Sequence, residues 1–117
     1  MKKNNVIQEK SFKFAEKVVK LYRFLLDNKK EYVLSKQFLR SGTSVGANIE
    51  EALGGTSSSD FTNKLSIAYK EARETKYWLR LLKSGEYIND KIFYEYFNDA
   101  EEICKILASI IKTMKDK

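Results

Sequence analysis

The sequence contains no histidine, no proline and a single cysteine in 117 residues. Histidine is the commonest general acid or base and the commonest zinc ligand, so its absence excludes the usual hydrolytic triads and any His/Cys metal site within one subunit. Catalysis by a carboxylate or a lysine stays open from composition alone. The lone Cys104 excludes an internal disulfide and is typical of a reducing compartment. We therefore expect a cytoplasmic protein with no cofactor and no metal.

Long hydrophobic runs are also missing. No apolar stretch approaches the roughly 18 residues that a membrane span needs. The basic N-terminus leads into Val6, Ile7, Gln8 and Glu9 rather than an apolar signal core. Hydrophobic residues make up 43% of the chain and charged residues 32%, which fits a globular protein. We expect residues 1–117 to form one domain with one core and no contact with a membrane.

The charge is uneven along this basic protein, which has a net charge of +6. Residues 1–40 hold 11 Lys and Arg against four Asp and Glu, whereas residues 41–117 hold 11 against 12. A local basic excess of this kind indicates a phosphate-rich partner.

Four segments carry apolar residues at the three- and four-residue spacing of a helix. We expect helices over residues 11–28, 34–53, 60–83 and from 89 nearly to the C-terminus. Ser11 is the expected cap of the first helix, and one of residues 58–60 the cap of the third. The expected apolar stripe of the first helix comprises Phe12, Ala15, Val18, Val19, Tyr22, Leu25 and Leu26. Short connections and the absence of strand alternation predict an all-α, up-down-up-down antiparallel four-helix bundle.

Residues 41–52 of the expected second helix are rich in small and polar side chains. Each glycine inside a helix costs about 1 kcal/mol relative to alanine, so close backbone approach or a buried polar network must offset that cost. Gly42 and Gly46 lie one turn apart and suit close approach of another helix. Glu71 and Thr75 fall within the apolar arc of the third helix, where an unpaired carboxylate is expensive. Arg40, Ser44 and Asn48 are its expected donors.

We interpret these residues as a buried structural polar layer that sets the register of the helices. Its expected members are Arg40, Ser41, Ser44, Asn48, Glu51, Glu71 and Thr75. The alternative is a ligand-binding or catalytic polar pocket with Glu71 as a base, but no histidine or paired acidic motif points to a reaction.

The expected nucleic-acid-binding residues lie on the first helix. Lys10, Lys13, Lys17 and Lys20 share one face and suit the neutralisation of phosphates, although an ordinary solvated face has the same pattern. Most of the seven Tyr and seven Phe residues fall on core arcs, so packing explains them better than base stacking. The better surface candidates are Tyr32, Tyr69 and Tyr94.

Two segments carry a family resemblance. FLRSGTSVGANIEEA (residues 38–52) and IAYKEARETKYWLRLL (residues 67–82) resemble the two conserved blocks of the bacterial four-helix-bundle proteins first noticed in intervening sequences of 23S ribosomal RNA genes. The resemblance implies a four-helix bundle and a homopentameric ring around a central channel. It also implies kinship with the accessory variability proteins of diversity-generating retroelements, basic rings that bind nucleic acid beside a reverse transcriptase. It carries over no catalytic residue.

The sequence therefore favours a non-enzymatic, oligomeric protein that binds RNA or DNA non-specifically through a basic face. The alternative is a structural ring that recruits a partner protein, such as a reverse transcriptase, and binds no nucleic acid.

Overall fold

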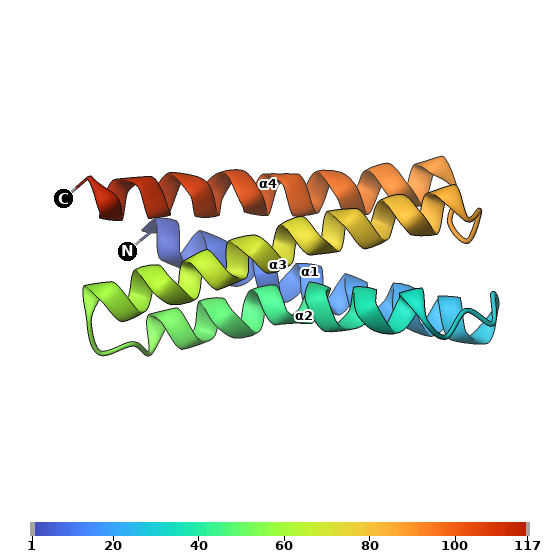
Figure 1. The fold of residues 1–117 in the computed structure, drawn as a ribbon, viewed down its shortest axis with the longest axis horizontal. Coiled ribbons are helices and arrows are strands. Elements are labelled where there is room, and N and C mark those ends of the chain that lie inside the picture. Colours follow the sequence, from blue (N-terminus) through green and yellow to red (C-terminus); the bar gives the residue numbers. More distant parts are fainter. Residues whose placement is uncertain (1, 117) are drawn as a thin grey trace.

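The computed structural model describes residues 2–116, with side chains from residue 6 onward. It contains four helices: α1 (Lys2–Asp27), α2 (Leu34–Leu53), α3 (Ser58–Ser84) and α4 (Asp90–Lys115). Consecutive helices run in opposite directions and lie side by side in a bundle of 47 × 21 × 20 Å (Figure 1). No strand occurs among the described residues, which confirms the predicted all-α four-helix bundle. None of the four helices is long and apolar enough to cross a membrane over the part described.

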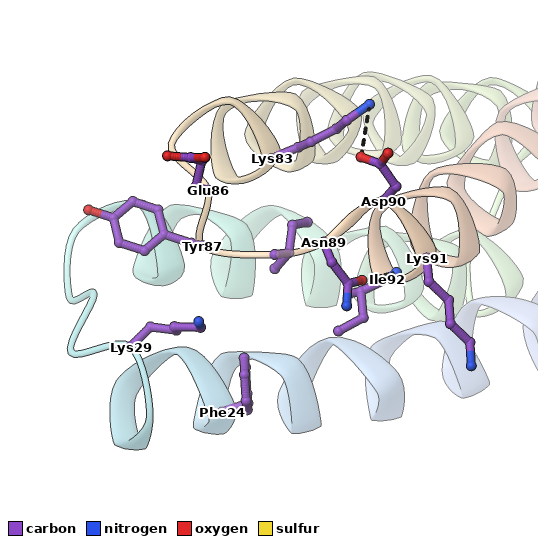
Figure 2. A pocket seen from close by; sticks show the side chains of 10 residues that line it. Phe24, Lys29, Lys83, Glu86, Tyr87, Asn89, Asp90, Lys91 and Ile92 are labelled. Atoms are coloured by element: carbon purple, nitrogen blue, oxygen red, sulfur yellow. Dashed lines mark hydrogen bonds and ion pairs between the residues drawn. The ribbon is translucent and has the colours of Figure 1, made fainter.

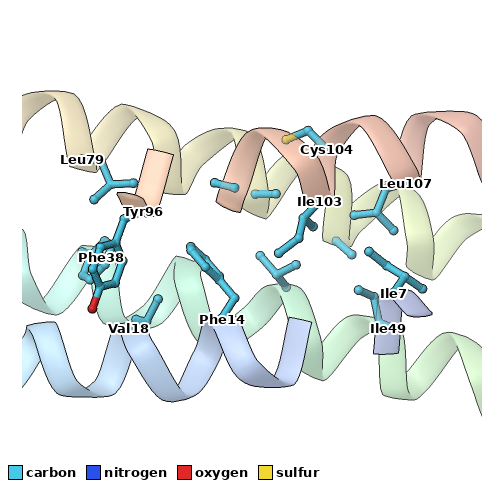
Figure 3. Close-up of a cluster of buried hydrophobic side chains, with 14 of the residues drawn as sticks. Ile7, Phe14, Val18, Phe38, Ile49, Leu79, Tyr96, Ile103, Cys104 and Leu107 are labelled. Carbon is cyan, nitrogen blue, oxygen red and sulfur yellow. The ribbon is translucent and has the colours of Figure 1, made fainter. Parts of the chain in front are cut away.

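All four helices contribute to one hydrophobic core (Figure 3). Phe38 of α2 lies edge-on to Tyr96 of α4, with ring centroids 6.2 Å apart. The hydroxyl of Tyr96 donates a hydrogen bond of 2.9 Å to the backbone carbonyl of Lys17 on α1. This bond satisfies the polar end of a buried ring and ties α4 to α1, the least closely packed pair of neighbouring helices.

Two helices begin at side-chain caps. Ser57 has extended backbone angles and its hydroxyl oxygen accepts a 3.0 Å hydrogen bond from the backbone N–H of Asp60. The side-chain carbonyl oxygen of Asn89, which also has extended backbone angles, accepts a 2.8 Å hydrogen bond from the backbone N–H of Ile92. The prediction of a cap within residues 58–60 was wrong by one residue, because Ser57 is the serine with extended geometry that reaches a free N–H of the first turn.

The predicted start of α1 at Ser11 was wrong. The helix already runs from Lys2, and Ser11 is a buried residue in its interior whose hydroxyl donates to the carbonyl of Gln8 at 3.0 Å. No proline or glycine interrupts the preceding residues, and Ile7 packs into the core. This packing favours continuation of the helix through both turns before Ser11.

The predicted apolar stripe of α1 was also wrong in part. Phe12 is 62% exposed and Val19 is 40% exposed. The side chains of α1 that enter the core are Ile7, Phe14, Val18, Leu21 and Leu25. The helix therefore has two neighbouring apolar stripes, one in the core and one at the surface.

Candidate nucleic-acid interface

The predicted lysine strip of α1 faces a row of carboxylates on α4. Lys17 Nζ lies 2.8 Å from Glu95 Oε2 and 2.5 Å from Asp99 Oδ2. Partial burial lowers the pKa of Lys17, but its hydrogen bonds to Asp99 and Glu95 outweigh this effect and the pKa is raised. The ammonium group of Lys17 is therefore held in ion pairs between α1 and α4.

Two more lysines of the strip are paired within the chain. Lys10 Nζ lies 3.1 Å from Glu102 on α4, and Lys13 Nζ lies 2.9 Å from Glu9, one turn earlier on α1. Lys20 is exposed and forms no ion pair with any described side chain. Because neighbouring carboxylates cancel most of the positive field, the strip is a weaker phosphate-binding face than its lysines alone indicate.

Positive charge without ion-pair partners also gathers on the outer side of α3 and α4. Six exposed bases there form no ion pair with another described side chain. We call this set the α3/α4 basic surface, and its members are Lys70, Arg73, Arg80, Lys91, Lys105 and Lys112. The charge pattern of a single segment does not predict this surface, because its charges come from two helices separated by a turn.

Helical spacing arranges these bases in two rows. Arg73 and Arg80 are seven residues apart on α3, as are Lys105 and Lys112 on α4, so each pair lies on one side of its helix about 10.5 Å apart. Lys91 extends the α4 row.

Ion pairs lie along the seam between the two rows. They join Lys76 to Glu101 at 2.9 Å and Lys83 to Asp90 at 3.6 Å. The same helix α4 thus presents carboxylates to α1 and unpaired lysines on its other edge.

Two aromatic rings stand within this surface. Tyr77 and Tyr94 are each 52% exposed. Tyr77 lies edge-on to Trp78, with centroids 5.2 Å apart, and Tyr94 lies edge-on to Phe93 at 5.0 Å. A hollow of about 470 Å³ lies beside them, lined by Tyr77, Arg80, Leu81, Lys83, Ser84 and Phe93.

The predicted surface tyrosines agree with the structure in two of three cases. Tyr32 and Tyr94 are exposed, whereas Tyr69 is half-buried against the core. Tyr77 was missed, although its position one heptad after Lys70 places it on the outer side of α3.

A second hollow, of about 770 Å³, lies at the end of the bundle where the α1–α2 and α3–α4 connections meet (Figure 2). Lys29, Lys83 and Lys91 line it together with Glu86 and Asp90. Its charges are mixed and the Lys83–Asp90 pair spans part of it (Figure 2). Lys91 borders both this hollow and the α3/α4 basic surface.

The predicted polar layer separates into two groups. Glu71, with a side chain 17% exposed, accepts hydrogen bonds of 2.9 Å from both Arg40 Nη1 and Ser44 Oγ. The prediction that Asn48 donates to Glu71 was wrong. The Asn48 amide donates instead to the carbonyl and the hydroxyl oxygen of Ser44, at 2.9 and 3.1 Å, because these acceptors lie one turn back on its own helix.

The second group consists of Thr75 and Ser41, which are buried in the core. Thr75 Oγ1 donates to Ser41 Oγ at 3.0 Å, and both residues are fully buried between α2 and α3. Arg40 lies at the surface, with its side chain 48% exposed, so its placement in a buried layer was wrong. The placement of Glu51 was wrong too, because Glu51 is exposed. Its position falls on the outer edge of α2, beyond the reach of the core.

Glu74 lies beside the first group. Its carboxylate accepts from Trp78 Nε1 at 2.9 Å and contacts Arg40. The Trp78 hydrogen bond has the largest effect on the pKa of Glu74 and lowers it. Burial opposes this effect, Arg40 adds to the lowering, and the pKa is lowered on balance. Arg40 thus bridges two carboxylates of α3, which fits a structural contact between helices better than a proton-transfer site.

The described residues offer neither a metal site nor a reactive thiol. Within residues 2–116 no group of three or more His, Cys, Asp or Glu side chains is placed to hold a metal ion. Cys104 is buried, and burial raises the pKa of its thiol, so it is poorly suited to act as a nucleophile.

Comparison with known proteins agrees with this fold. The family profile of the 23S rRNA-intervening sequence proteins matches residues 3–109. The crystal structure of a protein of unknown function from the S23 ribosomal protein family of Bacteroides thetaiotaomicron is 55% identical, with a TM-score of 0.93 over 94% of this chain and 98% of that one. No curated protein matches. Neither relationship indicates an enzymatic family. The chain belongs to the 23S rRNA-intervening sequence protein family.

Proposed function

We propose that this protein is a non-enzymatic, oligomeric nucleic-acid-binding protein of the cytoplasm, and that the α3/α4 basic surface contacts phosphates without reading sequence. The observation that carries the proposal is the clustering of six exposed bases without ion-pair partners in the described chain. Each phosphate that such a base neutralises releases a condensed counterion, and this release drives non-specific binding.

The dimensions of the surface suit a nucleic-acid backbone. The α4 row from Lys91 to Lys112 covers 21 residues, or about 31 Å. At about 3.4 Å of rise per nucleotide this length corresponds to roughly nine nucleotides of one strand. Packed helices lie about 8–10 Å apart, so bases from α3 and α4 are close enough to follow the same backbone.

The α1 strip is the poorer candidate. A phosphate that bound Lys10 or Lys17 would have to displace Glu102, Glu95 or Asp99 and would then lie beside those carboxylates. The like charges oppose binding, whereas the α3/α4 basic surface requires no such exchange.

Binding to labelled RNA and DNA at low salt tests the proposal. The affinity should fall linearly with salt on logarithmic axes, with a slope of about −0.9 for each duplex phosphate neutralised and about −0.7 for each single-strand phosphate. Absence of binding to both polymers at about 50 mM salt, or binding that does not change with salt, would overturn it.

We also propose that copies of the chain associate through the surface stripe of α1. Its members are Phe12, Ala15, Val19, Tyr22 and Leu26. Their alternating spacing of three and four residues is that of a helix–helix seam, and an exposed phenylalanine on such a seam is typical of an interaction site. The homopentamer implied by the family resemblance is the assembly that we expect.

The same stripe supports the second candidate function, a scaffold ring that recruits a protein such as a reverse transcriptase and binds no nucleic acid. The two functions differ in one outcome. A scaffold assembles and shows no salt-dependent binding to RNA or DNA.

A further inference from the structure

We propose that Tyr77 and Tyr94 stack on unpaired bases, so that the α3/α4 basic surface takes single-stranded rather than duplex nucleic acid. This inference rests on the proposed function and specifies its substrate class. It starts from the two half-exposed rings that stand among the bases of that surface.

The two rings are held in place before any ligand arrives. Tyr77 packs edge-on against Trp78, whose indole N–H is fixed by Glu74, and Tyr94 packs edge-on against the buried Phe93. Edge-on contact leaves a face of each tyrosine ring free of its aromatic neighbour. A ring held in this way loses little conformational entropy when a base stacks on it.

Cations lie beside the rings. The Lys83 ammonium is 5.0 Å from the centroid of Tyr94 and 4.7 Å from that of Phe93. Arg80 and Lys83 line the same 470 Å³ hollow as Tyr77 and Phe93. Lys83 is itself paired with Asp90 at 3.6 Å, so Arg80 is the cation that is open to a phosphate. A nucleotide at this position finds the Tyr77 ring for its base and Arg80 for its phosphate, the combination found in proteins that bind single strands without sequence preference.

A duplex could contact the basic side chains of this surface but not stack on its two tyrosine rings. Its bases are stacked on each other, so their faces are closed to Tyr77 and Tyr94, and it can contact only the lysine and arginine rows. A single strand uses both the cations and the rings. Stacking is also tolerant of sequence because every base has a flat face.

Fluorescence anisotropy with the full chain tests the inference. The probes are an oligothymidine of about 20 nucleotides, an oligouridine of the same length and a duplex of the same length, at about 50 mM salt. The variant is Tyr77→Ala with Tyr94→Ala, and the matched control is Tyr77→Phe with Tyr94→Phe, which keeps both rings. All four substitutions are at half-exposed positions, where the fold depends little on the side chain.

The wild type should bind the single strands more tightly than the duplex. The alanine pair should bind single strands about tenfold more weakly and the duplex less than about twofold more weakly, and the phenylalanine pair should match the wild type. Equal binding of duplex and single strands by the wild type, or unchanged single-strand binding by the alanine pair, would overturn this inference and leave the proposed function intact. Failure of the wild type to bind any probe would overturn both.

Discussion

Lys17 on α1 and Asp99 on α4 form an ion pair across the bundle, with Nζ 2.5 Å from Oδ2 and only 32% of the lysine side chain exposed. Glu95 lies on the same ammonium at 2.8 Å. The pairing changes the interpretation of α1. Two lysines of the most regular row in the sequence, Lys10 and Lys17, contribute to the contact between α1 and α4. A third, Lys13, pairs with Glu9 within α1.

Replacement of Lys17 by methionine should therefore affect stability more than binding. We expect the free energy of unfolding to fall by about 1 kcal/mol, the upper end for partly exposed pairs, and affinity for nucleic acid to change less than about twofold. Because the pKa of Lys17 is raised in the folded state, its contribution is complete below the ordinary value of 10.5 and is lost as pH rises through the raised pKa. Urea unfolding at neutral and strongly alkaline pH should show the difference between wild type and variant shrinking. A constant difference would contradict the ion-pair explanation.

Glu31 caps α2 from outside the helix. The residue is 8% exposed, and its carboxylate accepts hydrogen bonds from the backbone N–H groups of Val33, Leu34 and Ser35, the shortest being 2.6 Å. Burial raises the pKa of Glu31, but the hydrogen bonds from Ser35, Leu34 and Val33 outweigh it and the pKa is lowered. The carboxylate therefore serves the free donors of the first turn.

Substitution Glu31→Ala should lower the free energy of unfolding by about 1–2 kcal/mol at neutral pH. Since the pKa of Glu31 is lowered, its contribution is complete above the ordinary value of 4.5 and is lost as pH falls through the pKa of the folded state. Glu51→Ala, at an exposed position of α2, is the matched control and should cost less than about 0.5 kcal/mol. Chemical denaturation at neutral and acid pH measures both. Equal losses in the two variants would show that the cap contributes nothing.

The two glycines of α2 should respond differently to alanine. A Cβ at Gly42 would lie 2.8 and 2.9 Å from the two methyl carbons of the buried Val18, whereas a Cβ at Gly46 would meet its nearest neighbour, the carbonyl oxygen of Ser11, at 3.4 Å. Valine is stiff and cannot easily move aside. We expect Gly42→Ala to destabilise the fold by about 1–3 kcal/mol and Gly46→Ala to change it by less than about 1 kcal/mol. Thermal unfolding compares them, and a neutral Gly42→Ala would contradict the close α1–α2 contact.

Polar residues on the surface stripe of α1 should break the assembly without unfolding the subunit. Phe12→Glu with Val19→Glu places two charges on the proposed seam. We expect light scattering to show the wild type near five times the 13.6 kDa mass of one chain and the variant near that of a single chain, with unchanged helix content. Val33→Glu, at a 72% exposed position outside the stripe, should leave the mass unchanged. A wild type that is already monomeric would contradict the proposed seam.

Much of the bundle could be predicted from the sequence because its signals are local. The end of α2 follows from Gly54 and Gly55, and the stop of α3 follows from Gly85. A carboxylate at position 71 inside an apolar arc demands donors, and the structure brings Arg40 and Ser44 to it. Asn48 differs because its amide bonds to Ser44, one turn back on its own helix.

The core-facing side of α1 and the pairing of its lysines could not be predicted, because both depend on tertiary contacts. The two apolar stripes of α1 are about equally hydrophobic, so periodicity alone could not decide which one enters the core. The structure places Val18 against Gly42 and leaves Phe12 outside. In the same way, a row of lysines on one helix gives no indication that carboxylates of a distant helix will neutralise it.

The central claim is that the α3/α4 basic surface, and not the lysine face of α1, binds nucleic acid. Two charge-matched variants test it most directly: Arg73→Glu with Arg80→Glu on α3, and Lys13→Glu with Lys20→Glu on α1, all four positions being exposed. Anisotropy titrations of the same labelled oligonucleotide over a range of salt should show the α3 variant losing at least about tenfold in affinity and about 1.4–1.8 units of salt slope, whereas the α1 variant stays within about threefold of the wild type. A larger loss in the α1 variant than in the α3 variant would contradict the claim.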